Sequence, residues 1–307
     1  MHKKSLIGRY WNKFFFAEFD PAPLALFRII FGIFLTVMFL ALAPNWVKYY
    51  GPGGVRPEPA GYNGWSLFVW TQQWIPIAVY WYLGLLASIA LAIGWKTRWS
   101  VVCLFIIQSS MNHADPMTIN GEDLVIRLLL FCAIFAPLGQ RFSIDRWLLL
   151  KKHPHSVQVF AIWPLRLMQV NIALIYAFSL PLKLAADTSW WNGEAIYWVM
   201  MTSTWNRWPI HHLFYNEILS NLITYSTVFI EGSFPILIWF KKTRIPILAA
   251  ISGFHLGLAI LLQHVSFFSI SMICAFILFI PAKHINSMIQ FFTNQLSVKY
   301  TKRIKPL

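Results

Sequence analysis

The sequence has few charged residues, and this scarcity argues against a soluble globular protein. Asp, Glu, Lys and Arg make up 12% of the 307 residues, about half of what a soluble domain carries, whereas hydrophobic residues make up 58%. About 20 apolar residues, or about 17 at minimum, are needed to cross a bilayer. Eight long apolar runs lie near 24–43, 74–94, 99–111, 124–138, 162–182, 218–239, 245–263 and 266–282. We therefore predict an all-α, polytopic integral membrane bundle of about eight transmembrane helices, with further interfacial or re-entrant helices.

Several signatures of metal sites and of familiar catalytic sites are also missing. The sequence has no glycine-rich nucleotide loop, no Gly-x-Ser-x-Gly and no pair of histidines at helical spacing, so no metal is predicted. Cys103, Cys132 and Cys274 fall in apolar runs without paired spacing. We expect these cysteines to be small core residues rather than ligands or disulfides. We also find no inverted repeat of the kind used by many transporters.

Basic residues outnumber acidic residues by 25 to 11, and their positions explain the excess. If the eight runs span the membrane with the N-terminus inside, most lysines and arginines fall on the cytoplasmic segments. This bias follows the positive-inside rule and predicts an N-in, C-in topology. The net charge of +14 thus reports orientation and some attraction to anionic membrane lipid, and we expect no nucleic-acid partner.

Composition divides the chain into three segments. Residues 1–20 are basic and aromatic and are predicted to form an interfacial amphipathic helix. Residues 21–284 form the transmembrane bundle, and residues 285–307 form a basic cytoplasmic tail. Within the bundle, the Trp-rich stretch 188–216 is expected to be re-entrant or interfacial. The third and fourth apolar runs are short, so we expect their polar ends to be sheltered inside the bundle.

Lys183 closes the fifth apolar run, and an ionisable residue at the end of a membrane helix is a candidate functional residue. Asp187 follows at i+4, so on a continuing helix its carboxylate would pair with the ammonium or tune its pKa. Trp190 and Trp191 come next and form an aromatic shelf. The alternative is a lysine that snorkels to the interface in an exposed ion pair of little energetic consequence.

The connection between the third and fourth runs is the most polar outer segment. His113 and Asp115 precede a proline, so we expect them in a turn rather than on a helix. Glu122 and Asp123 end this outer segment just before the fourth run, and Arg127 lies one turn inside the fourth span. An arginine at that depth needs a partner, and Asp123 or Glu122 is nearest in sequence. The alternative is a structural pair that fixes helix packing.

Two further polar residues lie within apolar runs. Glu231, in the sixth run, must either pair or stay protonated. His255 lies between Gly253 and Gly257, which would let a neighbouring helix or a ligand come close. A hydrogen-bonded core histidine is the alternative interpretation of His255.

Four stretches of the chain carry a resemblance to a known family. They are Asp20-Pro-Ala-Pro to Arg28 and Gly32, Asn120-Gly-Glu122-Asp to Asp145, Lys183-Leu-Ala-Ala-Asp187 to Ala195, and Phe254-His255 to Met272. In order and spacing they resemble the HTTM (horizontally transferred transmembrane) family, and in particular the membrane core of vitamin K-dependent gamma-glutamyl carboxylase. Membrane proteins that mature a bacterial sporulation-delaying peptide toxin look similar too.

The charge pattern places Lys183 on the outer side, and we predict a site that faces the outer side of a bacterial plasma membrane. In the carboxylase, a matching lysine followed by leucine deprotonates vitamin K hydroquinone, and Lys183 occupies that position. The implied function is a carboxylase-like membrane enzyme whose lysine base acts on a quinol-like or peptide-linked substrate, with a quinone or hydroquinone as cofactor. The predicted catalytic residues are Lys183, Asp187, Glu122 and His255. The predicted substrate- or cofactor-binding residues are Arg28, His113, Asp115, Asp123, Arg127, Trp190, Trp191 and Glu231.

The sequence differs from the carboxylase in two respects that bear on the implied reaction. Glu122 stands where the carboxylase has a catalytically important histidine, and only a short basic tail follows the last apolar run. The membrane core and the lysine are therefore better predicted than carboxylation itself. The alternative function is a non-enzymatic membrane partner in the maturation or export of a small secreted peptide or toxin, bound to that peptide or to another membrane protein. A transporter is the third hypothesis.

Overall fold

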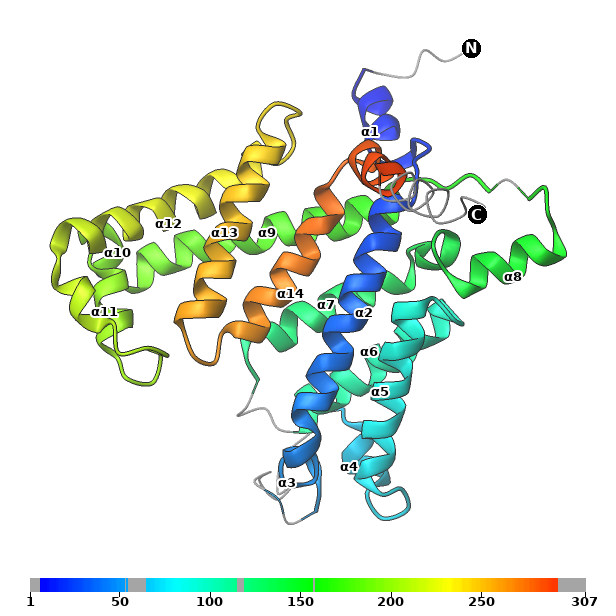
Figure 1. Cartoon of the computed structure of the whole chain (residues 1–307), viewed down its shortest axis with the longest axis horizontal. Coiled ribbons are helices and arrows are strands. Elements are labelled where there is room, and N and C mark those ends of the chain that lie inside the picture. Colours follow the sequence, from blue (N-terminus) through cyan, green and yellow to red (C-terminus); the bar gives the residue numbers. More distant parts are fainter. Residues whose placement is uncertain (1–5, 53, 55–64, 115–118, 157, 292–307) are drawn as a thin grey trace, which may run out of the picture.

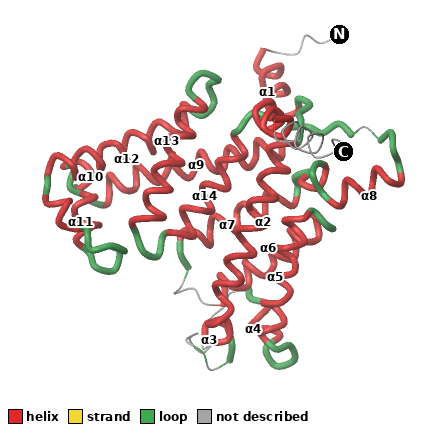
Figure 2. Tube along the Cα trace, viewed as in Figure 1, coloured by secondary structure: helices red, strands yellow, loops and turns green. Residues whose placement is uncertain are grey.

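The computed structural model describes residues 6–52, 54, 65–114, 119–156 and 158–291, and these ranges are built from helices (Figures 1 and 2). The α-helices are α1 (Leu6–Phe16), α2 (Ala22–Leu42), α3 (Trp46–Tyr50), α4 (Leu67–Thr71), α5 (Ile77–Ile93), α6 (Thr97–Ala114), α7 (Gly121–Ile134), α8 (Ile144–Lys152), α9 (Trp163–Ala186), α10 (Ser189–Asn192), α11 (Ala195–Met201), α12 (Glu217–Leu237), α13 (Arg244–Leu261) and α14 (Ser266–Phe276). The 3-10 helices are η1 (Ala43–Asn45), η2 (Leu138–Gln140), η3 (His211–Tyr215) and η4 (Ile277–Phe279). Within the described ranges, β-structure is limited to two isolated bridges, Glu18–Ala161 and Asn206–Leu262. The all-α prediction is confirmed.

Each of the eight apolar runs in the sequence coincides with a helix, in the order α2, α5, α6, α7, α9, α12, α13 and α14. Among the described residues, Ala22–Tyr50, Trp163–Ala186 and Arg244–Leu261 are long and apolar enough to cross a membrane. A fourth crossing results if Ser266–Phe279 and Ala282–Phe291, which are bent by 97°, count as one span. The protein is therefore a helical membrane protein, whereas about eight crossings and the N-in, C-in orientation stay predictions.

These helices pack in a closed series. From α12, contacts run to α13, then to α14, α2 and α5, which lie in sequence across Figure 1. The ring of contacts closes as α5 packs against α6, α6 against α7, α7 against α9, and α9 against α12. α7 also packs against α14 across the ring. Helices far apart in sequence, such as α2 and α14, are thus neighbours in space.

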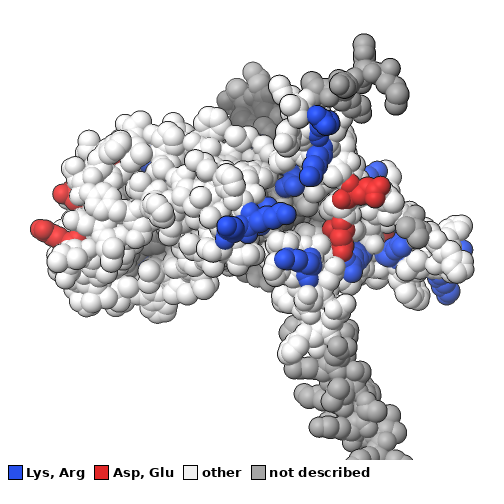
Figure 3. All heavy atoms as spheres, turned by 90° about the horizontal axis from the view of Figure 1, so that it is seen from above, with Lys and Arg blue, Asp and Glu red and all other residues white. Residues whose placement is uncertain are grey.

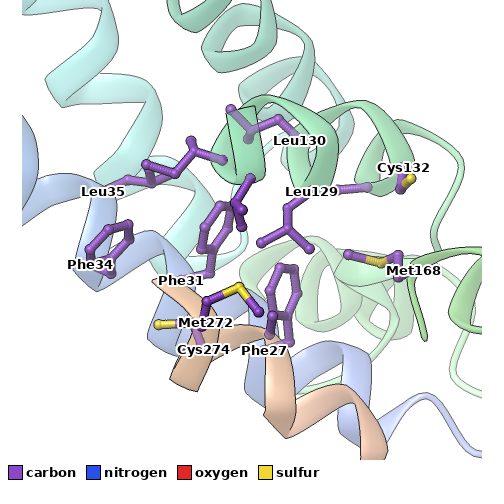
Figure 4. Packing of buried hydrophobic residues seen from close by; sticks show 14 of the residues in the cluster. Phe27, Phe31, Phe34, Leu35, Leu129, Leu130, Cys132, Met168, Met272 and Cys274 are labelled. Atoms are coloured by element: carbon purple, nitrogen blue, oxygen red, sulfur yellow. The ribbon is translucent and has the colours of Figure 1, made fainter. Parts of the chain in front are cut away.

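The core lies where α2, α7, α9 and α14 meet (Figure 4). Phe27 and Phe31 of α2 point toward Leu129 of α7, Met168 of α9 and Met272 of α14, and all five side chains are buried. The Phe27 and Phe31 rings stack with their centroids 4.9 Å apart. In a membrane this packing, rather than exclusion of water alone, holds the helices together.

The cysteines fit this core as the sequence predicted. Cys132 and Cys274 are buried in the main hydrophobic cluster, and Cys103 is half-buried against it. All three are free thiols.

The polar end of the short helix α6 is sheltered, as expected for a helix with too few apolar residues. Gln108, Ser110 and Asn112 are all buried. Gln108 Nε2 donates to Asn112 Oδ1 at 3.0 Å and to a carboxylate oxygen of Asp123 on α7 at 2.9 Å. Ser66 Oγ, just before α4, donates to the carbonyl oxygen of Ser110 at 2.9 Å. These bonds satisfy groups that lipid tails could not.

Segments that the charge pattern places inside meet at one end of the molecule. Asp20, before α2, accepts hydrogen bonds from Arg141 Nη1 at 2.5 and 2.7 Å and from Asn286 Nδ2 at 2.9 Å. Asp145, at the start of α8, accepts from the backbone N–H groups of Lys96 and Thr97, each at 2.8 Å. Figure 3 looks onto this end and shows Lys and Arg gathered over it with Asp and Glu among them, whereas the opposite side of the view, which holds α10 and α11, shows mainly Asp and Glu.

The N-terminal segment is helical where it is described. No residue of α1 is buried, which fits a helix lying on a surface. The ring centroids of Phe14 and Trp239 are 5.6 Å apart, and the Arg166 guanidinium carbon lies 4.6 Å from the Phe14 ring centroid. Residues 1–5 and most of the predicted tail, residues 292–307, lie outside the described residues.

Candidate functional site

The ammonium of Lys183 is paired with the carboxylate of Glu231. Lys183 lies in the last turn of α9, and Glu231 lies on α12, which packs against α9. Lys183 Nζ is 2.7 Å from both carboxylate oxygens. The Lys183 side chain is 33% exposed and the Glu231 side chain 5%, so the cation reaches the surface while the acid is buried. Glu231 is therefore paired, one of the two states expected of a carboxyl in an apolar run.

The predicted pairing of Lys183 with Asp187 is wrong. α9 ends at Ala186, and Asp187 has extended backbone angles, φ −147° and ψ 123°. The i+4 relation no longer places two side chains on one face once the helix has ended. The exposed Asp187 carboxylate instead accepts from Ser189 N–H at 2.8 Å, and the hydrogen bonds of Ser189 hold the pKa of Asp187 below its usual value.

The two tryptophans after α9 have different roles. The Lys183 ammonium lies 5.1 Å from the Trp190 ring centroid, a cation–π distance. Trp191 is exposed, and its indole N–H donates a hydrogen bond to the carbonyl oxygen of Leu184 at 2.8 Å. This hydrogen bond stabilises the turn between α9 and α10. Its own carbonyl oxygen accepts from Tyr225 Oη of α12 at 2.9 Å. Trp190 is thus a contact of the lysine, and Trp191 fixes the segment that carries Trp190.

A second polar pair, Tyr176 with His255, lies deeper between α9 and α13. Tyr176 Oη is 2.6 Å from His255 Nε2, and the two residues are 4% and 1% exposed. His255 Nδ1 is buried without a partner among the described residues. Tyr176 lies seven residues before Lys183, two turns along the same face of α9. We did not predict Tyr176, although that spacing was visible in the sequence.

The glycines on either side of His255 border open space rather than a close helix. A Cβ atom at Gly253 or Gly257 would meet nothing within 4 Å. Both line an apolar cavity of about 190 Å3 between α11, α12 and α13, together with Ile223 and Phe254. The space beside α13 leaves room for the approach that the sequence suggested, and the approach of a helix or a ligand stays a prediction.

Glu122 and Asp123 lie at the start of α7, in a different part of the molecule. Asp123 closes the capping box of α7, because its carboxylate accepts from the backbone N–H of Asn120 at 3.0 Å. Burial and the neighbouring Asp123 charge raise the pKa of Glu122 to about 7, while a hydrogen bond from the Phe268 backbone partly offsets them. Both acids line a cavity of about 360 Å3 with Tyr50.

Phe268 lies between the Glu122 cavity and His255. Its ring centroid is 5.6 Å from that of His255. Its backbone forms a hydrogen bond with the Glu122 carboxyl group. The structure therefore brings Lys183, Glu231 and Trp190 together and places His255 beside them through Tyr176. Glu122 stays on the far side of an aromatic ring, so it does not contact the lysine.

Arg127 and His113 contact each other in a third place. His113 lies in the last turn of α6 rather than in the expected turn, because α6 continues to Ala114. Arg127 Nη1 is 3.4 Å from His113 Nε2, and this is its described hydrogen bond. The predicted partner Asp123 interacts with Arg127 through its charge rather than through a described hydrogen bond. Asp115 lies outside the described residues.

Arg28 belongs to the end of the molecule that holds Asp20. It is fully buried, and its Nη2 donates to the carbonyl oxygen of Phe142 at 2.6 Å. Gly94, which ends α5 with a φ of 74°, lies against it: a Cβ there would be 1.5 Å from Arg28 Nη1. The turn therefore needs glycine both for its left-handed backbone and for space. The structure does not bring Arg28 to Lys183.

The fold and these residues define a class of protein. It is an all-helical membrane protein with a partly exposed lysine–carboxylate pair at the end of one long apolar helix. Within the described residues, no three His, Cys, Asp or Glu side chains form a group that could hold a metal ion.

Comparison with known families places the chain more closely. The family model described as HTTM domain matches residues 16–283, and the chain belongs to this family. No curated protein matches the chain, and no solved structure matches it.

Proposed function

We propose that this HTTM-family protein is a membrane enzyme in which Lys183 is the base and Glu231 its proton-exchange partner. The observation that carries the proposal is the pair itself, with both carboxylate oxygens 2.7 Å from Nζ. A buried carboxylate and a surface-reaching ammonium form a path for one proton between the interior and a bound substrate.

The pair supports base chemistry for a physical reason. An ammonium becomes a base only after it loses a proton, and Glu231 is in hydrogen-bonding distance to take it. Apolar surroundings penalise two separated charges, so Nζ and the carboxylate stay in contact and a proton can pass directly between them. Lys183 is one-third exposed, and its amine can therefore meet a substrate that arrives from the membrane or from water.

A flat, weakly acidic substrate of the hydroquinone class suits these residues. The Trp190 ring beside Lys183 offers an aromatic face, and the apolar cavity at Gly253 and Gly257 offers room for a hydrocarbon group on α13. A bound hydroquinone would supply a phenolic proton of pKa about 10, within reach of a lysine amine. Lys183, after passing its own proton to Glu231, would take the phenolic proton and become an ammonium again, leaving the hydroquinone monoanion, while Glu231 keeps the proton that it received.

The other predicted catalytic residues have different relations to this chemistry. His255 is hydrogen-bonded to Tyr176 and orients the α9–α13 contact behind the pair. Asp187 and Glu122 make no described contact with Lys183, so we assign them no step at the lysine. We also propose that the site faces the outer side of a bacterial plasma membrane, because Lys183 lies at the end away from the basic cluster around Arg141.

Substitution of Lys183 and Glu231 tests the proposal. The proteins to purify are wild type, Lys183→Gln, Glu231→Gln and the control Lys48→Gln, whose lysine is exposed on α3. The measurements are mass spectrometry of co-purifying small molecules and the rate at which dioxygen oxidises added hydroquinone to the quinone, with hydrogen peroxide as the other product, because the deprotonated hydroquinone is the form that reacts. We expect both site variants to lose activity at least about 100-fold, the range of one acid–base group, and Lys48→Gln to match wild type. Unchanged quinone content and turnover in Lys183→Gln would refute the proposal.

One observation favours a second function, a non-enzymatic partner of a secreted peptide. A cavity of about 570 Å3 lies beyond α10 and is lined by Glu194, Glu217, Tyr197 and Trp198. Carboxylates beside aromatic faces bind cationic side chains, so a basic peptide segment is the suitable occupant. A peptide that co-purifies with wild type and Lys183→Gln, but not with Glu194→Gln/Glu217→Gln, would support this function over the enzyme.

A further inference from the structure

A groove between α6 and α7 is separate from the Lys183 site and has its own polarity. It has a volume of about 560 Å3, within the range of about 300–1,000 Å3 that is usual for small-molecule sites. Phe105, Ser109 and His113 follow one another at spacings of four on α6 and form one wall. Arg127 and Phe131, also four apart, lie on the other wall.

Polarity changes along this groove. Arg127 and His113 lie near the ends of α7 and α6 that approach the connecting segment, with Nη1 and Nε2 3.4 Å apart. Deeper in the groove, the Phe105 and Phe131 rings approach to 5.7 Å between centroids. The groove opens outward, since Leu124 and Phe131 on its edge are 48% and 46% exposed. A cationic end and an apolar floor match an amphiphile that lies with its head toward the membrane surface.

A buried hydroxyl supplies a second, independent sign of a ligand. Ser109 lines the groove and is only 6% exposed, yet its Oγ has no hydrogen-bond partner among the described residues. A buried hydroxyl without a partner costs free energy, so an acceptor in the groove would be stabilised there. An ester carbonyl, which lies between the head and the acyl chain of a lipid, is such an acceptor.

The acids of the same helix lie outside the groove, although the Asp123 charge interacts with that of Arg127. Glu122 and Asp123 line the neighbouring cavity of α7. The Asp123 carboxylate is held there by Gln108 and by the Asn120 N–H. Of the described charged side chains, Arg127 is thus the one that lines the groove, and charge complementarity selects an anionic head.

We propose that the groove between α6 and α7 is a binding site for an anionic phospholipid. Its acidic headgroup lies on Arg127, its ester carbonyl accepts from Ser109, and one acyl chain lies on the floor that the Phe105 and Phe131 rings form together. The site does not depend on Lys183, so this proposal stands or fails separately from the enzyme.

Native mass spectrometry of the full-length protein in detergent tests the site. The probes are a phosphatidylglycerol and a phosphatidylcholine with the same acyl chains, added in equal amounts. We expect wild type to retain the phosphatidylglycerol preferentially, and Arg127→Gln to lose that preference about five-fold, as one basic residue at a membrane surface contributes. Lys48→Gln, the charge-matched control, should keep it. Equal retention of both lipids by wild type, or an unchanged preference in Arg127→Gln, would overturn the proposal.

A second variant keeps the test decisive if Arg127→Gln does not fold. Leu124→Trp fills the groove from its exposed edge and leaves Arg127 in place. It should reduce retention of both lipids, whereas Ser109→Val should weaken both to a smaller extent. Wild-type retention in folded Leu124→Trp would also overturn the proposal.

Discussion

Two ion pairs lie at opposite ends of α9, and the surroundings of their acids differ. Arg141 and Asp20 pair near the start of α9, and Lys183 and Glu231 pair at its last turn. The two cations are equally exposed, 34% and 33%, but Asp20 is 35% exposed and Glu231 only 5%. The two ion pairs have similar geometry, but because one acid is exposed and the other buried, they differ in how much they contribute to the free energy of unfolding.

The neighbours of each acid explain what its pair does. Asp20 also accepts from Asn286 and from the backbone N–H of Ala22 at 3.0 Å, so it clamps three segments of the chain together. The described hydrogen bonds of Glu231 all come from Lys183. An acid with several donors suits a structural clamp, whereas a buried acid with one movable donor suits proton exchange.

The largest expected effect is on stability when Lys183 is removed. Lys183→Met leaves Glu231 buried without its cation and should lower the free energy of unfolding by about 3 kcal/mol, measured by denaturant unfolding in detergent. The double variant Lys183→Met/Glu231→Leu should recover most of this loss, because two apolar groups need no partner. A double variant as unstable as the single one would contradict the assigned pairing.

Tyr176→Phe should have the next largest effect. It removes the described hydrogen bond of His255, whose other ring nitrogen has no partner in the part of the chain that the structure describes, and should cost about 2 kcal/mol in the same unfolding measurement. Tyr225→Phe, which loses a bond at an exposed site, is the control and should cost less. Equal losses in the free energy of unfolding would show that the buried Tyr176–His255 hydrogen bond contributes no more to stability than the exposed bond of Tyr225.

Arg141→Met should cost at most about 1 kcal/mol. Asp20 keeps Asn286 and the Ala22 N–H, and water reaches its carboxylate. Unfolding of this variant beside Lys183→Met compares the two ion pairs directly. A loss at Arg141 as large as the loss at Lys183 would remove the distinction between clamp and buried pair.

The smallest effect is on the pH dependence of stability, and two acids should show opposite signs. Burial raises the pKa of Asp20, but hydrogen bonds from Asn286 and Arg141 outweigh it and leave the pKa below 3.8. This stabilisation is present above pH 3.8 and is lost as the pH falls through the lower, folded pKa. Glu122 has a raised pKa, so its folded form binds a proton more readily, and stability falls as the pH rises from 4.5 to about 7.

Melting curves across this pH range measure both slopes. Glu122→Gln should remove the fall between pH 4.5 and about 7, and Asp20→Asn should flatten the loss at acid pH. A Glu122→Gln variant with the wild-type slope would show that another group causes it.

The sequence predicted local features well. Apolar runs of helical length gave the positions of the eight main helices, because a backbone in an apolar solvent must satisfy its own hydrogen bonds. The polar residues of α6, such as Gln108 and Asn112, were correctly expected inside, since a short apolar run leaves no other place for them. Lys183 and Glu231 were each singled out for the same reason, the cost of charge among apolar neighbours.

Partners could not be predicted in the same way. Asp187 was the nearest acid to Lys183 in sequence, but the helix ends between them. Arg127 was expected to bond an acid on its own helix, and its described contact is His113 across the groove. Spacing along a helix decides which residues share a face, and it says nothing of where the helix stops or of which helix packs against that face.

The sequence by itself determined that this is a helical membrane protein, which residues are costly to bury, and the family to which the chain belongs. The tertiary structure alone decided that Lys183 pairs with Glu231, 48 residues away, and that Tyr176 meets His255, 79 residues away. The reason is that backbone hydrogen bonding and apolar runs are local properties. The neutralisation of a buried charge depends instead on which helices are adjacent, and the closed packing of α9 with α12, and α12 with α13, sets that adjacency.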